Sequence, residues 1–198
     1  MNSHAMNPVQ RLPGLQRGAS LLMVMIILVV VSLLGLAGVQ IAAMGERSAR
    51  NDRDQQIAWQ SAEAALIDAE FDIYGPVSSS RRAVFGAAPN LSQFQVDCGE
   101  NTAAGLCALV ATGKPAWLTV NFNSNKAAEF GQFTGRTFSA GGAGIKPAAR
   151  PRYVTEAIRD PSDRDMGSTS PTYIYRVTAM GFGPRKEIQA VVQMLYRV

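Results

Sequence analysis

The apolar residues of this chain include one unbroken run near its start. No charged residue occurs between Arg17 and Glu46, and the stretch from Ala19 to Ala43 is almost entirely apolar. A run of this length exceeds the roughly 20 residues that a helix needs to cross the hydrocarbon core of a bilayer. We therefore predict a membrane-spanning helix here.

A helical pattern continues beyond that run. No proline occurs between Ala43 and Pro76, and Gly75 with Pro76 is a helix-stop signal. Small or apolar residues recur at the spacing of one helical face, namely Ala58, Ala62, Ala65, Leu66, Ala69 and Ile73. We predict one continuous helix, about 80 Å long at helical rise, with its first half in lipid and its second half in a domain.

Four acidic residues lie within the alanine-striped part of this helix: Glu63, Asp68, Glu70 and Asp72. They lie largely off the alanine stripe, so we expect them to face water. The alanines are small enough for a sheet to pack closely over the opposite face.

The rest of the chain contains strand patterns separated by turn residues. The better ones are residues 152–160 and 172–182, which alternate, and 187–198, which follows the turn 183–186 as a hairpin. Weaker candidates are residues 94–97, 107–111 and 116–122. An antiparallel sheet over the alanine-rich helix face predicts an α+β fold.

The stretch 123–151 between these strands is rich in glycine, alanine and serine. We expect a long exposed loop there, in the kind of segment that commonly carries surface contacts.

The segment before the apolar run, residues 1–18, carries Arg11 and Arg17 and no acidic residue. Positive charge before a first apolar segment keeps that end in the cytoplasm, so the rest of the chain would cross the membrane. A cleaved secretory signal has an apolar core of only about 7–15 residues, roughly half of what is present. An uncleaved anchor and cleavage between Gly18 and Ala19 are the other two interpretations.

Two cysteines, Cys98 and Cys107, are the only ones in the chain. A domain delivered across the membrane lies in an oxidising compartment, which favours a disulfide between them. The alternative is a pair of free buried thiols.

The composition gives little support for catalysis or metal binding. The only histidine, His4, precedes the apolar run, so a chain without its leader has no histidine for acid–base catalysis or metal binding. The serines of 78–80 have no base beside them, and the glycine-rich 141–146 lacks the spacing of a phosphate-binding loop. We expect no enzyme activity, no cofactor and no metal.

Two surface stretches contain residue types that are found in binding sites. Asp160, Asp163 and Asp165, followed by Gly167, offer oxygen ligands for calcium, but an exposed charged turn is the preferred interpretation. Three basic residues, Lys146, Arg150 and Arg152, lie beside a glycine-rich loop. With a net charge of only +4, solvated loop charge is preferred over nucleic-acid binding.

The junction QRG-ASLL at residues 16–22 resembles a type IV prepilin signal. The resemblance implies that a prepilin peptidase cleaves after Gly18 and N-methylates Ala19. The apolar helix then stays on the mature protein as filament core, and it can loosen near Gly35 and Gly38. Most members carry a glutamate at the fifth mature position, where this chain has Met23. That departure favours a minor subunit near the filament tip.

Two further segments resemble the PilX-type minor pilins: AWQSAEAALIDAE at 58–70 and the ending YRVTAMGFGPRKEIQAVVQMLYRV from Tyr175. The resemblance implies a pilin-like roll and a role in type IV pilus assembly, in an initiation or tip complex that supports twitching motility and adhesion.

The same resemblance implies the chain's organisation: a cleaved leader (1–18), a transmembrane and filament-core half-helix (19–45) and a periplasmic domain (46–198). Implied partners are other minor pilins, the major pilin, the prepilin peptidase, the inner membrane and a tip adhesin. Alternatives are a minor pseudopilin of a type II secretion system, an adhesin or DNA-binding pilin using the 123–151 loop, and an anchored periplasmic protein unrelated to filaments.

Overall fold

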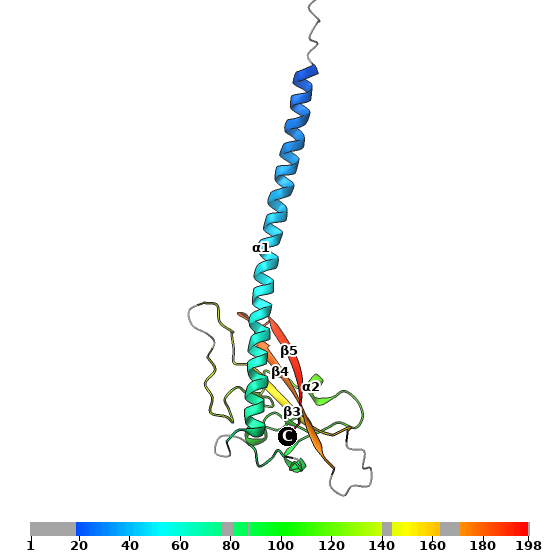
Figure 1. Ribbon diagram of the computed structural model, residues 1–198, viewed down its shortest axis with the longest axis vertical. Coiled ribbons are helices and arrows are strands. Elements are labelled where there is room, and N and C mark those ends of the chain that lie inside the picture. The colour runs from blue at the N-terminus through cyan, green and yellow to red at the C-terminus, as the bar shows by residue number, and fades with distance from the viewer. Residues whose placement is uncertain (1–18, 77–80, 87, 140–143, 163–170, 198) are drawn as a thin grey trace, which may run out of the picture. The chain divides into compact units, whose positions relative to one another are not determined.

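The computed structural model describes residues 19–76, 81–86, 88–139, 144–162 and 171–197. The chain divides into two compact units, one up to Ala49 and the other from Arg50 onward. A single long helix, α1 (Ala19–Tyr74), contributes to both units, and it ends immediately before Gly75 and Pro76, as predicted (Figure 1).

The apolar part of α1 has no covering layer within its own unit. Its large apolar side chains from Leu21 to Met44 are each between 48% and 71% exposed. By length and composition, α1 is the one described helix able to cross a membrane. Exposed apolar area of this extent is stable only in lipid or against other apolar surfaces.

The second unit contains a sheet of five strands: β1 (Leu106–Cys107), β2 (Ala128–Glu129), β3 (Arg152–Arg159), β4 (Tyr173–Phe182) and β5 (Gln189–Arg197). The order is β1-β3-β4-β5, with β2 also paired to β3. Strands β3, β4 and β5 are antiparallel neighbours, and β2 runs antiparallel to β3. The α+β fold is confirmed. The sheet is nevertheless mixed rather than wholly antiparallel, because β1 pairs with β3 in parallel.

The three better strand predictions are confirmed, including the hairpin between β4 and β5. The weaker ones are largely wrong. Residues 116–119 form a short helix, α2, which begins after Pro115, and Phe94 only ends the 3₁₀ helix η1 (Leu91–Gln93). The left-handed backbone of Asp97 (φ 70°) then prevents an extended strand. Of 107–111, only Cys107 lies in a strand.

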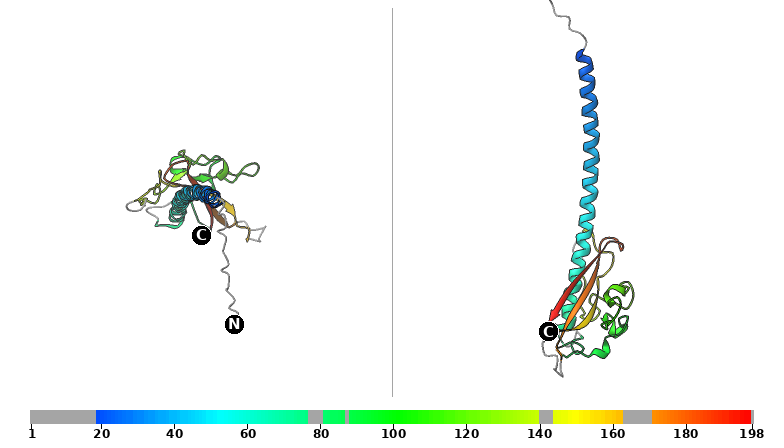
Figure 2. Two further views of the ribbon diagram at one scale, coloured as in Figure 1. Left: turned by 90° about the horizontal axis from the view of Figure 1, so that it is seen from above. Right: turned by 90° about the vertical axis from the view of Figure 1, so that its right-hand side faces the viewer.

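The part of α1 from Arg50 onward lies along one face of the sheet (Figures 1 and 2). Five of the six residues of its predicted stripe, Ala58, Ala62, Ala65, Ala69 and Ile73, are at most 1% exposed, and the sixth, Leu66, is partly buried. The alanines let the sheet approach until a Cβ atom at Gly181 of β4 would overlap the helix backbone at Ala58 and Ala62. Glycine on β4 and alanine on α1 therefore set the closeness of the two layers.

The core between these layers contains Tyr153 of β3 and Tyr175, Val177 and Ala179 of β4. A second, smaller cluster includes Cys98, Cys107, Ala116, Phe122 and Val154. Since neighbouring strand residues point to opposite faces, Val154 places this second cluster on the face of the sheet away from Tyr153.

Candidate functional site

Two of the four acidic residues between positions 58 and 74 of α1 are buried. Asp68 and Asp72 are fully buried, whereas Glu63 and Glu70 are exposed. The expectation that all four face water is therefore wrong for the two aspartates. Buried carboxylates are costly unless they are paired, so the partners of these two residues determine what this part of the helix can do.

Asp72 is held by a buried arginine and a buried tyrosine. The Nε of Arg81 donates to Asp72 Oδ2 at 3.0 Å, and the Tyr153 hydroxyl donates to the same oxygen at 3.1 Å. The Arg81 side chain is only 10% exposed. The Nη2 of Arg81 also donates to Asp72 Oδ2, and an arginine–carboxylate pair with two such bonds has fixed geometry.

Arg81 also connects the helix to two loops. Its Nη1 donates to the carbonyl oxygen of Ala104 at 2.7 Å, and its guanidinium lies 3.6 Å from the centre of the Phe133 ring. One side chain therefore joins the end of α1, the disulfide loop and the 130–134 segment. Burial, and then the charge of Asp72, raises the pKa of Tyr153 well above its usual value, so its hydroxyl stays protonated as a donor.

Asp68 accepts hydrogen bonds from the segment that follows β2. The backbone N–H of Gly131 donates to Asp68 Oδ2 at 2.7 Å, and the Thr134 hydroxyl donates to Oδ1 at 2.6 Å. Arg136 completes an ion pair at 3.6 Å. Burial raises the pKa of Asp68, and these partners oppose that shift.

The sequence did carry a signal for these two buried acids. Ala58, Ser61, Ala65, Asp68 and Asp72 follow a 3-4-3-4 spacing, which is one edge of the buried stripe. Assigning acidic residues to the solvent face by their charge overlooks this spacing. Apart from Arg81, nine positions after Asp72, the partners lie 63 to 81 positions away in the chain. Local patterns do not reveal such contacts.

The expected exposed loop 123–151 is wrong for its first part. Within it, Ala127, Ala128, Phe130 and Thr134 are buried, and the Phe130 ring contacts Phe138 edge-on at 5.2 Å. The bonds to Asp68 explain why a segment poor in strand pattern is nonetheless packed. Residues 140–143 lie outside the described part of the chain.

The disulfide between Cys98 and Cys107 is present. Both cysteines are buried, at 3% and 0% exposure, in the cluster under α2. Since Cys107 belongs to β1, the bond ties the loop before β1 to the sheet.

The other residues singled out from the sequence are not brought together. Gly35 and Gly38 lie in the apolar part of α1 with open space around them, so their role in helix loosening stays a prediction. Ala19 is the first residue of α1. Gly18 lies outside the described residues, and so does any geometry of the cleavage site.

The structure describes only part of the acidic stretch. Asp160 pairs with Arg197 at 3.0 Å, while Asp163, Asp165 and Gly167 lie outside the described residues. No cluster of potential metal ligands occurs among the residues described.

The basic stretch is likewise partly neutralised. Arg150 and Arg152 both pair with Glu129, at 3.3 and 3.2 Å. Only Lys146 of the three basic residues is left without a contact to that carboxylate. The described residues thus present no strip of free cations here.

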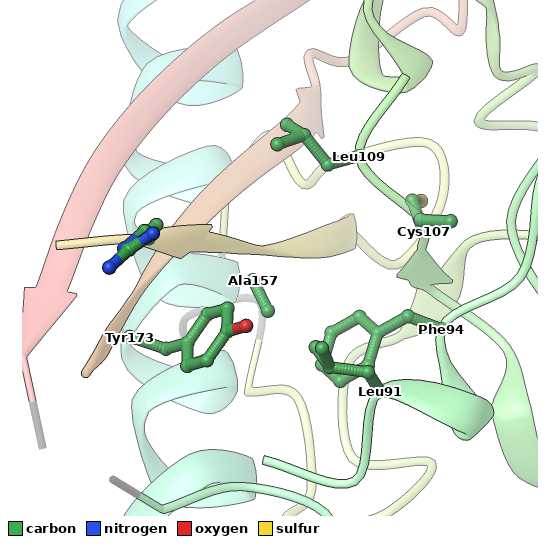
Figure 3. A pocket seen from close by; sticks show the side chains of 8 residues that line it. Leu91, Phe94, Cys107, Leu109, Ala157 and Tyr173 are labelled. Carbon is green, nitrogen blue, oxygen red and sulfur yellow. The ribbon is translucent and has the colours of Figure 1, made fainter. Parts of the chain in front are cut away.

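A pocket of about 350 Å³ opens beside the C-terminal end of β3 (Figure 3). Its walls are mainly apolar and include Leu91, Phe94, Leu109 and Tyr173. Arg159 is the one charged residue that lines it.

Comparison with protein-family models places both parts of this geometry in one family. Residues 17–66, most of α1, match the PilX N-terminal model. Residues 103–198, which contain all five strands, match the model described as type IV pilus assembly protein PilX C-term. No curated protein and no solved structure matches the chain. These two matches identify the chain as a member of the PilX family of type IV pilus assembly proteins, the minor pilins.

Proposed function

We propose that this chain is a structural subunit that helps start type IV pilus assembly, together with other minor pilins and ahead of the major pilin. The observation that carries the proposal is α1, a helix whose first half is wholly exposed and apolar while its second half is built into a folded domain. The first half needs apolar partners. A lipid bilayer before assembly and the helices of other pilins afterwards both meet that need.

The proposal includes processing and location. A prepilin peptidase cleaves after Gly18 and methylates the new amino terminus at Ala19. The chain first crosses the inner membrane once, with its domain in the periplasm, and then moves to the pilus tip. Met23 suits a tip subunit, since a subunit with no neighbour above it needs no buried carboxylate at that position.

The processing step is tested by mass spectrometry of the N-terminal peptide purified from cells. A peptide that begins with N-methylated Ala19 is expected, and Gly18→Glu should leave the leader uncut. A chain that begins at Met1, or after Ala43, contradicts the prepilin proposal.

The assembly role is tested by deleting the gene in the host and returning it on a plasmid. Surface pili and twitching should fall on deletion and return with the intact gene, but not with the Gly18→Glu variant. Normal piliation in the deletion strain contradicts the role. Loss of a secreted enzyme with normal pili would point instead to a secretion system.

The family consists of structural components of the pilus, so no enzymatic step is included in the proposal. Twitching and adhesion depend on this subunit only through the filament it helps to start.

A further inference from the structure

The face of α1 that points away from the sheet has an ordered pattern of its own. Six residues of the domain half follow a 4-3-4-3-4 spacing: Gln56, Gln60, Glu63, Ile67, Glu70 and Tyr74. We call them the outer seam. At about 100° per residue, they form one narrow strip on the side opposite the buried alanines. This 3-4 alternation is the spacing by which one helix packs along another.

Every residue of the outer seam is exposed, including its large apolar members. Ile67 is 49% exposed and Tyr74 is 55% exposed. Two aromatic residues flank the seam: Trp59, 50% exposed, and Phe71, 45% exposed. Aromatic side chains set around polar positions are typical of interface centres rather than of free helix surface.

The seam is acidic. Glu63 and Glu70 are seven residues apart, or about 10.5 Å along the helix, and no lysine or arginine belongs to the seam. Glu63 accepts one hydrogen bond, from Trp59 Nε1 at 2.7 Å. Two cations stack on these aromatic rings: Arg82 lies 4.9 Å from the ring of the seam residue Tyr74, and Arg136 lies 4.4 Å from the ring of the flanking Phe71. Neither forms an ion pair with Glu63 or Glu70 among the residues described.

From this geometry we infer that the outer seam binds a helix of a different pilin-type subunit, one that carries lysine or arginine seven residues apart beside apolar side chains. The inference deepens the proposed function by naming the partner's chemistry, and it rests on that function. A helix fits because its own 3-4 ridges match the seam, and because cations seven residues apart would face both glutamates. A hollow of about 160 Å³ beside Glu70, Phe71 and Tyr74 leaves room for a partner side chain.

A second copy of this chain does not supply a helix with basic residues seven positions apart. The basic residues of α1 are Arg47, Arg50 and Arg53, and no two of them are seven residues apart. The partner is therefore a different subunit, which agrees with a mixed complex of minor pilins.

The test uses the full chain in cells that make the whole pilus system. A photo-crosslinking amino acid is placed at Gln60, on the seam, and at Val96 as a matched control, since Val96 is 79% exposed and far from the helix in sequence. Crosslinked peptides are identified by mass spectrometry. The expected product at Gln60 joins this chain to a helical segment of another pilin, with basic residues seven apart. Val96 should give no such product.

The charge requirement is tested with Glu63→Arg/Glu70→Arg, which should lower the Gln60 crosslink several-fold. The control is Glu187→Arg, an exposed acidic residue in the β4–β5 turn, which should leave the yield unchanged. An unchanged melting temperature of both variants shows that they are folded, because all three glutamates are exposed.

Three outcomes overturn the inference: a Gln60 crosslink to a second copy, a crosslink to a strand or lipid only, or a yield insensitive to the double charge reversal. They differ from failure of the proposed function. If deletion of the gene abolishes pili while the crosslink maps elsewhere, the assembly role stands and the seam assignment is wrong.

Discussion

The Tyr153 hydroxyl donates a hydrogen bond of 3.1 Å to Asp72, a residue 81 positions earlier in the chain. This bond joins β3 of the sheet to the last turns of α1. Through this bond and the bond from Arg81, the buried carboxylate of Asp72 connects the helix layer and the sheet layer of the domain. Arg81 is the only cation paired with Asp72 in the part of the chain described.

Arg81→Ala should destabilise the domain by about 3–5 kcal/mol, because it leaves the carboxylate of Asp72 buried without its cation. Urea unfolding of the full chain in detergent, followed by tyrosine and tryptophan fluorescence, measures the change. Arg82→Ala is the matched control. Its side chain is exposed and stacks only on Tyr74, so a loss of about 0.5 kcal/mol or less is expected. Equal losses in the two variants would contradict the role of Arg81.

Asp68 should make stability depend on pH. Burial raises its pKa in the folded domain above the unfolded value of 3.8. A raised folded pKa means that the folded state holds the proton more tightly. The stability from Asp68 is therefore fully present below pH 3.8 and is lost as pH rises through the folded pKa.

Asp68→Asn removes this titration, while its amide oxygen still accepts from Gly131 N–H. The difference in unfolding free energy, wild type minus variant, should fall as pH rises from about 3.5 through the raised pKa. Denaturant melts at half-unit pH steps measure it. Parallel curves for the two proteins would show that burial does not raise this pKa.

The Cys98–Cys107 disulfide closes a loop with a sequence separation of 9. In the chain-entropy model a loop of this size contributes about 2.5–3 kcal/mol. Cys98→Ala/Cys107→Ala should lower the unfolding free energy by roughly that amount, measured by urea unfolding. Reduction of the wild type with dithiothreitol should have the same effect, and it should leave the double variant unchanged. If dithiothreitol also destabilised the double variant, its effect on the wild type would not be due to this disulfide.

Gly181 sets the distance between β4 and α1. A Cβ atom there would overlap the helix backbone at Ala58 and Ala62, so Gly181→Ala should cost about 3 kcal/mol, the upper range for an overpacked core. Gly45→Ala is the control, since nothing lies within 4 Å of a Cβ at that position and alanine favours a helix by about 1 kcal/mol. Thermal melts of both variants distinguish the two cases. A tolerated Gly181→Ala would mean that the layers can separate at little cost.

Much of this architecture is determined by local sequence pattern. The apolar run before Glu46, the alanine stripe and the Gly75-Pro76 stop define α1, because helical periodicity and helix-stop residues act over a few positions. Alternation identifies β3, β4 and β5 for the same reason. The two cysteines were paired correctly because no other cysteine exists.

Only the tertiary structure decided the burial of Asp68 and Asp72, the packing of 127–134 and the parallel pairing of β1. The two aspartates depend on partners outside the helix: Arg81, nine positions after Asp72, Tyr153, 81 positions after Asp72, and Gly131, 63 positions after Asp68. A buried charge is tolerated when hydrogen-bond or ion-pair partners surround it in the folded protein. The periodicity of the sequence does not reveal those partners. The sequence alone determined which segments fold, and the long-range polar contacts decided how the helix is held on its sheet.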